Sequence, residues 1–156
     1  ATSIAANTTV YAKWAKAGTY TMVSGGEGKG FDFNAEKGCW VSNNNGKNSS
    51  SATLTITAVD GPIVVSFSYA CGGEGSYSYY DYLMIQKNST KIVEKYAQGS
   101  SATEGTLKEV GPMTIQLNVG EKLVFTYTKD SSQAGSYDYA HIIDLTVNGA
   151  EAELKA

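Results

Sequence analysis

Hydrophobic and polar residues alternate with a period of two along most of the chain. Leu54, Ile56 and Ala58 alternate with threonines, and similar patterns recur over 63–69, 113–119 and 123–127. Successive side chains of a β-strand point to opposite faces, so each run buries one face and exposes the other to water. The pattern predicts strands near residues 19–23, 30–34, 38–42, 52–58, 62–70, 79–87, 91–96, 113–119, 121–128 and 139–148.

Turn residues separate several of these runs. Asp60-Gly61-Pro62 separates two of them and Asn118-Val119-Gly120-Glu121 separates two more, which is turn chemistry between antiparallel strands. Helical periodicity is scarce, and its best example, 91–98, fits a strand equally well. Many strands at short spacing predict an all-β fold, which we expect to be a jelly-roll-like antiparallel β-sandwich.

Composition narrows the classes of function. The chain has 156 residues, a formal net charge of −3 and twelve basic residues, all of them lysines. Such a chain lacks the basic footprint of a nucleic-acid binder, so we expect no nucleic-acid partner. No apolar run approaches the length of a membrane helix, so we also expect no membrane insertion. We expect an isolated domain of this kind to be a monomer.

A Gly-Ser-Tyr phrase occurs at 75–77 and again at 135–137. Each copy follows an apolar strand and a polar loop and precedes another strand, which predicts two equivalent long hairpins in the two halves of a jelly roll. Exposed aromatic rings stack on sugar rings, and nearby acids bond the hydroxyls. The candidate ligand-binding residues are therefore Tyr77, Tyr79, Tyr80, Tyr82, Tyr137, Tyr139, Asp81 and Asp138. The alternative is that these tyrosines cap the core with their hydroxyls in water.

Catalytic machinery is sparse in this sequence. His141 is the single histidine, and on a strand it faces away from Asp144 and toward the side of Ile143, Leu145 and Val147. We therefore expect a partly buried histidine rather than a catalytic pair. With no arginine and no nucleophile motif, we expect no enzymatic activity.

Two further chemistries have candidate residues. Asp130 and Asp138 flank a hydroxyl-rich loop and offer oxygen ligands, so calcium is a candidate ion, although loop acids are more often simply in water. We expect no other cofactor. Cys39 and Cys71 each lie at an edge of a strand-like run. If the two strands are neighbours a disulfide fits, and we favour it over two buried free thiols.

Residues 7–14, Asn-Thr-Thr-Val-Tyr-Ala-Lys-Trp, resemble the closing strand of the Listeria–Bacteroides repeat, a module found along bacterial surface proteins. The resemblance implies that residues 1–16 are the remnant strand of a preceding surface repeat. Residues 17–150 would then be the β-sandwich domain, and 151–156 a tail or linker. It also implies an extracellular or cell wall-associated location in a bacterium.

A second resemblance covers about residues 50–148. The runs VSFSY (65–69), YDYLMIQKN (80–88) and FTYTKDSS (125–132), followed by YDYAHIIDL (137–145), are similar to hairpins of bacterial jelly-roll domains related to MAM and cleaved-adhesin modules. That family usually has paired acids where only Asp144 stands here, which puts its calcium site in doubt. The resemblance implies a non-catalytic carbohydrate-binding or adhesion module of a larger surface or secreted protein. Its partner would be a glycan or a host or cell-surface protein, bound by the loops 72–80 and 131–139. The alternative is a structural spacer without a ligand.

Overall fold

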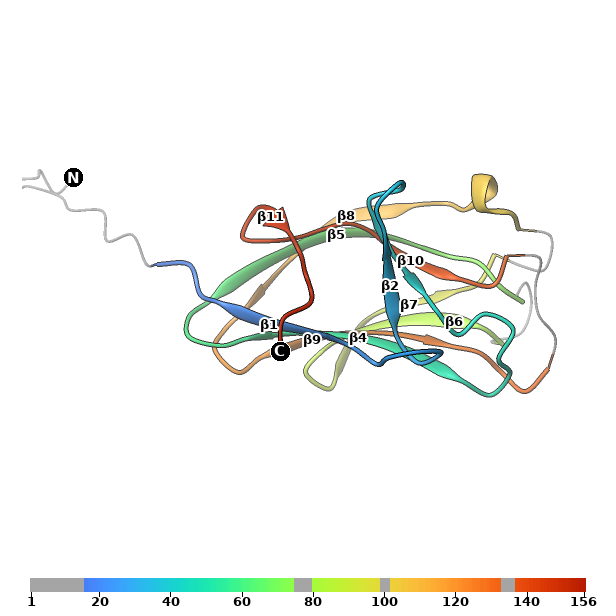
Figure 1. The fold of residues 1–156 in the computed structure, drawn as a ribbon, viewed down its shortest axis with the longest axis horizontal. Coiled ribbons are helices and arrows are strands. Elements are labelled where there is room, and N and C mark those ends of the chain that lie inside the picture. The colour runs from blue at the N-terminus through green and yellow to red at the C-terminus, as the bar shows by residue number, and fades with distance from the viewer. Residues whose placement is uncertain (1–15, 75–79, 99–101, 133–136) are drawn as a thin grey trace, which may run out of the picture.

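Two antiparallel sheets pack face to face in the computed structural model, which describes residues 16–74, 80–98, 102–132 and 137–156 (Figure 1). The first sheet has the order β1 (Tyr20–Ser24), β4 (Ser51–Ala58), β9 (Lys122–Thr128), β6 (Tyr82–Lys87) and β7 (Thr90–Tyr96). The second has the order β2 (Phe31–Asn34), β3 (Cys39–Ser42), β10 (Ala140–Val147), β5 (Ile63–Cys71) and β8 (Val110–Leu117). The short β11 (Ala150–Glu151) pairs with β10, and a single 3-10 turn, η1 (Glu104–Thr106), precedes β8. The all-β sandwich expected from the alternating pattern is confirmed.

The topology is that of a jelly roll. Strands β4-β9-β6-β7 of one sheet face strands β3-β10-β5-β8 of the other, the eight-stranded double Greek key of this fold. The turns at 59–62 and 118–121 each carry the chain from one sheet to the other, so they do not join paired strands as expected. The loops after β5 and after β9 also change sheets, so the two expected hairpins are crossovers. Turn residues mark where the chain reverses, but the hydrogen-bonding partner is set by packing.

The core lies between the sheets and follows the period of two. In β4, Ala52, Leu54, Ile56 and Ala58 are fully buried, while the threonines between them are half-buried on the outer face. Phe67 of β5 meets Phe125 of β9 edge to face, with ring centroids 5.0 Å apart. This favourable aromatic geometry stabilises the packing of β5 against β9 in the opposite sheet.

A bulge in β10 changes the expected face of two residues. Asp144 has a left-handed φ of 49°, and the register with β5 shifts between Ile143 and Thr146. The extra residue turns Leu145 and Val147 into the core, whereas alternation alone would have kept them on the side of His141. His141 lies on the outer face of its sheet and is 6% exposed, as expected for a partly buried histidine.

The expected disulfide between Cys39 and Cys71 is wrong. Both residues are free and buried, because β10 lies between β3 and β5. Strands two places apart are separated by roughly 9–10 Å, beyond the reach of a disulfide. Burial raises the pKa of the Cys71 thiol to about 12, so this side chain behaves as a small apolar group.

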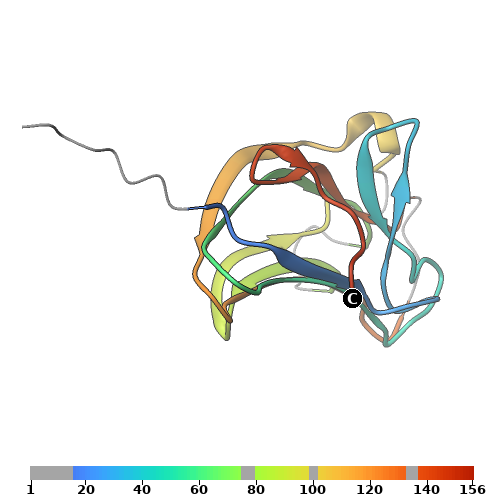
Figure 2. The ribbon, with the colours of Figure 1, turned by 60° about the vertical axis from the view of Figure 1, so that its left-hand side comes forward.

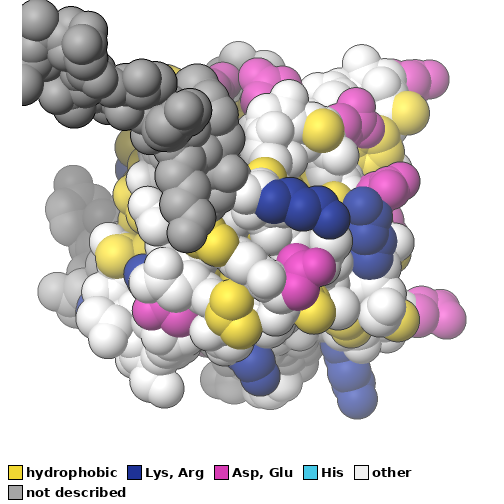
Figure 3. All heavy atoms as spheres, turned by 90° about the vertical axis from the view of Figure 1, so that its left-hand side faces the viewer, with side chains coloured by type: hydrophobic (Ala, Val, Ile, Leu, Met, Phe, Trp, Pro, Cys, Tyr) yellow, Lys and Arg dark blue, Asp and Glu magenta, His cyan; other side chains and the backbone are white. Residues whose placement is uncertain are grey.

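The C-terminal residues of the chain pair with β1. Met22 and Lys155 exchange two backbone hydrogen bonds of 2.8 and 2.9 Å. In Figure 3, which faces the end of the sandwich opposite the tyrosine loops, hydrophobic side chains are scattered among polar and charged ones on the coloured part of the surface. Within the described residues, no helix has the length and apolar character needed to cross a membrane.

Candidate functional site

The two tyrosine-rich loops meet at one end of the sandwich. The backbone N–H of Gly72, just after β5, donates to the carbonyl of Tyr139, just before β10, at 2.9 Å. The Tyr127 hydroxyl at the end of β9 donates to the Gly72 carbonyl at 2.8 Å. The described ends of both loops are therefore side by side, as the sequence repeat predicted (Figure 1). Tyr77 and Tyr79 lie outside the described residues.

Tyr137 and Tyr139 line a groove of about 720 Å³ on the outer face of the second sheet. Their ring centroids are 4.9 Å apart with planes tilted by 50°, and both side chains are half-buried. The β2–β3 hairpin forms one wall, and η1 lies beside the tip of that hairpin (Figure 2). Polar side chains from both parts line the rest, notably Asp32, Lys37, Asn43, Asn45 and Glu104. We call this feature the tyrosine groove.

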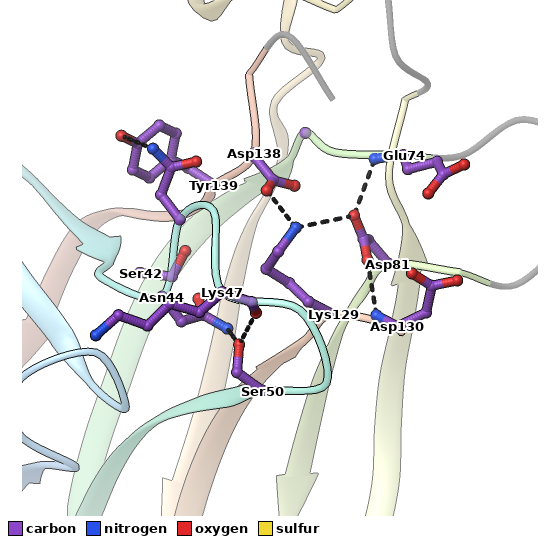
Figure 4. A network of polar contacts seen from close by, with 12 residues as sticks. Ser42, Asn44, Lys47, Ser50, Glu74, Asp81, Lys129, Asp130, Asp138 and Tyr139 are labelled. Carbon is purple, nitrogen blue, oxygen red and sulfur yellow. Dashed lines mark hydrogen bonds and ion pairs between the residues drawn. The ribbon is translucent and has the colours of Figure 1, made fainter. Parts of the chain in front are cut away.

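Hydrogen bonds fix both rings of the groove. The Asn45 side-chain amide donates to the Tyr139 hydroxyl at 2.8 Å (Figure 4). The Tyr137 hydroxyl is hydrogen-bonded to Nε2 of His141 at 2.7 Å. Burial lowers the pKa of His141, so this imidazole is neutral at pH 7 and orients Tyr137 instead of carrying charge.

The hairpin that forms the wall is held by local turn chemistry. The Asn34 side-chain oxygen accepts hydrogen bonds from the backbone N–H groups of Glu36 and Lys37. Gly38 then adopts a left-handed φ of 60°, which a residue with a side chain rarely adopts. At the tip, the Lys37 ammonium pairs with the Glu104 carboxylate, and this contact raises the pKa of Lys37 and lowers that of Glu104. The pair closes the rim of the groove.

Asp81 and Asp138 are not part of the groove surface. Both are buried at the same end of the sandwich, together with Lys129: Asp81 is 0%, Asp138 1% and Lys129 2% exposed. The Lys129 ammonium contacts Oδ2 of Asp138 and lies 3.5 Å from Oδ2 of Asp81 (Figure 4). The two carboxylates expected to bond a surface ligand therefore bond an internal cation.

Further contacts complete this buried cluster. Asp81 accepts hydrogen bonds from the backbone N–H groups of Glu74 at 2.9 Å and Asp130 at 3.1 Å, one on each carboxylate oxygen. The Tyr127 hydroxyl lies 3.3 Å from Oδ1 of Asp138. Burial is the strongest influence on Asp81 and raises the pKa of its carboxyl. We refer to Asp81, Tyr127, Lys129 and Asp138 as the lysine cluster.

The remaining candidates are spread around the same end. Tyr80 is 43% exposed and Tyr82 is half-buried on β6, and neither lines the groove. The Asp130 side chain accepts a hydrogen bond from the backbone of Ser132 at 2.9 Å, whereas Asp138 pairs with Lys129. In the part of the chain that the structure describes, no three His, Cys, Asp or Glu side chains gather as a metal site. Calcium binding stays a prediction.

Sequence reasoning found the tyrosines of the groove and missed its walls. Asp32, Lys37 and Glu104 lie far from the tyrosine phrases along the chain and join them only through the sheet order. Asn43 and Asn45 carried a readable signal, since an Asn-Asn-Asn-Gly turn directly follows β3. In the lysine cluster, Lys129 continues the inward series Leu123, Phe125 and Tyr127, which is the pattern that marks it as buried.

A larger hollow of about 760 Å³ lies between β1, the start of β2 and the C-terminal residues, with Met22, Phe31 and Leu154 in its lining. It contains no pair of aromatic rings, and Phe31 is only 1% exposed. The tyrosine groove is the better match to the chemistry of the candidate residues.

No family model matches the chain, and neither does any curated protein. Among solved structures, it is similar to the secreted serine protease VesC from Vibrio cholerae, with a TM-score of 0.47, 12% identity, and coverage of 72% of this chain and 22% of that one. It is also similar to dimeric latent PorU from Porphyromonas gingivalis, with a TM-score of 0.41, 10% identity, and coverage of 90% and 14%. The chain thus spans less than a quarter of either protein, and likenesses of this strength assign it no activity.

Proposed function

We propose that this chain is a non-catalytic ligand-binding module that binds an oligosaccharide in the tyrosine groove. The observation that carries the proposal is the pair of half-buried tyrosine rings lining a groove of about 720 Å³ among carboxylate, amide and ammonium side chains. Apolar faces of sugar rings stack on tyrosine, and hydroxyl groups bond to carboxylates and amides. A rigid sandwich with ligand chemistry at its loops suits such a role.

The chemistry near the groove supports binding more than catalysis. The single histidine, His141, is neutral and its Nε2 is hydrogen-bonded to the Tyr137 hydroxyl. Asp81 and Asp138 are buried and paired with Lys129. Glu104 and Lys37 neutralise each other at the rim. In the cell, we place the module in a larger bacterial surface or secreted protein, where it would contribute to adhesion to glycans or to a glycosylated surface protein.

A glycan array followed by calorimetric titration of the best hit tests this proposal. Stacking at a shallow site predicts a dissociation constant of about micromolar to millimolar. Tyr139→Ala should weaken binding about tenfold or more, because it removes one of the paired rings. Tyr80→Ala is the matched control: it removes an exposed tyrosine at the same end but outside the groove, so affinity should be unchanged.

The alternative function is a structural spacer without a ligand. Tyr137 and Tyr139 are half-buried and each hydroxyl already has a protein partner, which is also how core-capping tyrosines behave. If the array and a cell-wall extract both give no binding, the tyrosines serve packing and the module is a structural spacer. Equal loss of binding in Tyr139→Ala and Tyr80→Ala would move the site away from the groove.

A further inference from the structure

The lysine cluster has no part in the proposed sugar site, and its composition is unusual for a protein interior. The Lys129 ammonium lies within ion-pair distance of the carboxylates of Asp81 and Asp138, and all three side chains are at most 2% exposed. One basic and two acidic side chains are therefore brought together in a buried site. Buried charges are unfavourable even when they are paired, so any reaction that removes two of them is favoured there.

We propose that Lys129 and Asp138 become joined by an intramolecular isopeptide bond, with Asp81 as the proton carrier for the condensation. Nζ of Lys129 contacts Oδ2 of Asp138, so the amine lies directly beside the carboxyl group that it would attack (Figure 4). A second carboxylate, Asp81, lies 3.5 Å from the same nitrogen. An amine, a carboxyl group and a nearby acid–base group are all that amide formation requires.

The reaction balances without any further reagent. Asp81 takes one proton from the Lys129 ammonium and leaves a neutral amine. The lone pair of Nζ attacks Cγ of Asp138, a C–N bond forms, and the carboxyl carbon becomes tetrahedral. The proton held by Asp81 and a second proton from Nζ go to one Asp138 oxygen, its C–O bond breaks, and water leaves. One ammonium and one carboxylate have become a neutral amide and a water molecule, and Asp81 ends as it began.

The surroundings distinguish the roles of the two acids. Both oxygens of Asp81 accept backbone N–H groups, which hold that carboxyl in place beside the lysine. Burial raises the pKa of Asp81, which suits a group that must accept a proton and return it. The Tyr127 hydroxyl, whose nearer acceptor is the Gly72 carbonyl at 2.8 Å, lies 3.3 Å from Oδ1 of Asp138, so its one proton is shared with the oxygen that gains charge during attack.

Intact mass spectrometry of the purified full chain under denaturing conditions is the first test. The expected mass is that of the sequence less one water molecule. Chymotrypsin cuts after Tyr137, between the two joined residues, so a cross-linked pair of peptides containing Lys129 and Asp138 should persist after digestion. A full-length mass equal to that of the sequence overturns the proposal, and this result does not depend on the folding of any variant.

Variants test which residues form the bond, and a chemical control tests whether the loss of water comes from another site. Lys129→Arg and Asp138→Ala should both restore the full mass, whereas Lys122→Arg, on the exposed side of β9, should keep the loss of water. Asp81→Asn, which preserves shape, should restore the full mass, and if it keeps the bond then Asp81 is not the proton carrier. Asp60-Gly61 can also lose water by forming a succinimide. Hydroxylamine cuts the chain at a succinimide but leaves a side-chain amide intact, so a dehydrated chain that hydroxylamine cuts between Asp60 and Gly61, or a loss of water that persists in Lys129→Arg, overturns the proposal.

Discussion

Replacing Tyr127 with phenylalanine isolates one buried hydrogen bond at the centre of the loop end. The Tyr127 hydroxyl is fully buried, lies 2.8 Å from the Gly72 carbonyl and 3.3 Å from Asp138, and links β9 of one sheet to the strand end of β5 in the other. Burial raises the pKa of this phenol, so it remains a donor wherever the protein is folded. Phenylalanine keeps the ring and removes only the donor.

The expected magnitude follows from what is left unpaired. The Gly72 carbonyl loses the donor of its 2.8 Å hydrogen bond in a buried site, and such a loss costs about 1–3 kcal/mol. For a chain of this length, each kcal/mol shifts the melting temperature by about 2–4 °C. Tyr127→Phe should therefore melt roughly 4–8 °C below the wild type, for a loss near 2 kcal/mol.

Urea denaturation followed by tyrosine fluorescence and circular dichroism measures this difference. The slope of the free energy against urea should stay the same, because the surface exposed on unfolding is unchanged. Tyr20→Phe is the matched control, since its hydroxyl accepts one exposed backbone N–H at 3.2 Å and its loss should shift stability by less than about 0.5 kcal/mol. Equal stability of Tyr127→Phe and the wild type would refute the reasoning.

Three further predictions concern the same half of the molecule. Burial lowers the pKa of His141, so the folded protein binds a proton at this side chain less readily than the unfolded chain does. The contribution of His141 to stability should therefore be complete above the pKa of the unfolded chain, about 6.5, and fall as the pH drops below it. Melting scans from pH 7.5 to 5.5 should show this fall in the wild type but not in His141→Gln. Gly73→Ala should lower the melting temperature, because Gly73 has a φ of 133° and a Cβ there would lie 2.5 Å from the Tyr127 hydroxyl; Gly46→Ala, with a positive φ but open space around it, is the milder comparison. Titration with a thiol reagent without reductant should find both Cys39 and Cys71 free after denaturation and slow to react before it, and a single surviving disulfide would contradict the strand order of the second sheet.

The strands were predictable because a period of two is a local property. The run from Ala52 to Ala58 fixes which face of β4 is buried, and neighbouring turn residues fix where it ends. Strand pairing was not predictable in the same way, because Asp60-Gly61-Pro62 would fit a hairpin as well as a crossover between sheets. The β10 bulge at Asp144 also escaped the pattern, since a polar residue on an outer face looks the same in a regular strand.

In the candidate site, too, residues that lie close together in the sequence were predictable, and residues brought together only by the fold were not. Tyr137 and Tyr139 were found because tyrosines cluster near one another in the sequence. Asp32 and Glu104 reach the groove only through the jelly-roll topology, which brings the β2–β3 hairpin beside η1. Asp81 and Asp138 were predicted as ligand residues because they stand beside the clustered tyrosines and could bond the hydroxyls of a sugar. The structure differs because Lys129, which directly follows β9 and continues its inward-facing series, pairs with both carboxylates inside the sandwich.

The paired backbone of Met22 and Lys155 has a mechanical consequence. These residues exchange hydrogen bonds of 2.8 and 2.9 Å, so the described beginning and end of the chain lie along the same strand, β1. A pulling force applied between Lys16 and Ala156 would load this short clamp and the neighbouring β1–β4 pairing first. The described start of β10 lies toward the far end of the sandwich (Figure 1), and β2, which forms a wall of the tyrosine groove, follows β1 along the chain and is loaded only after β1 has detached. A ligand held there would remain gripped while the attachment of β1 yields, and single-molecule pulling from the two ends should register the rupture of β1 before the groove is disturbed.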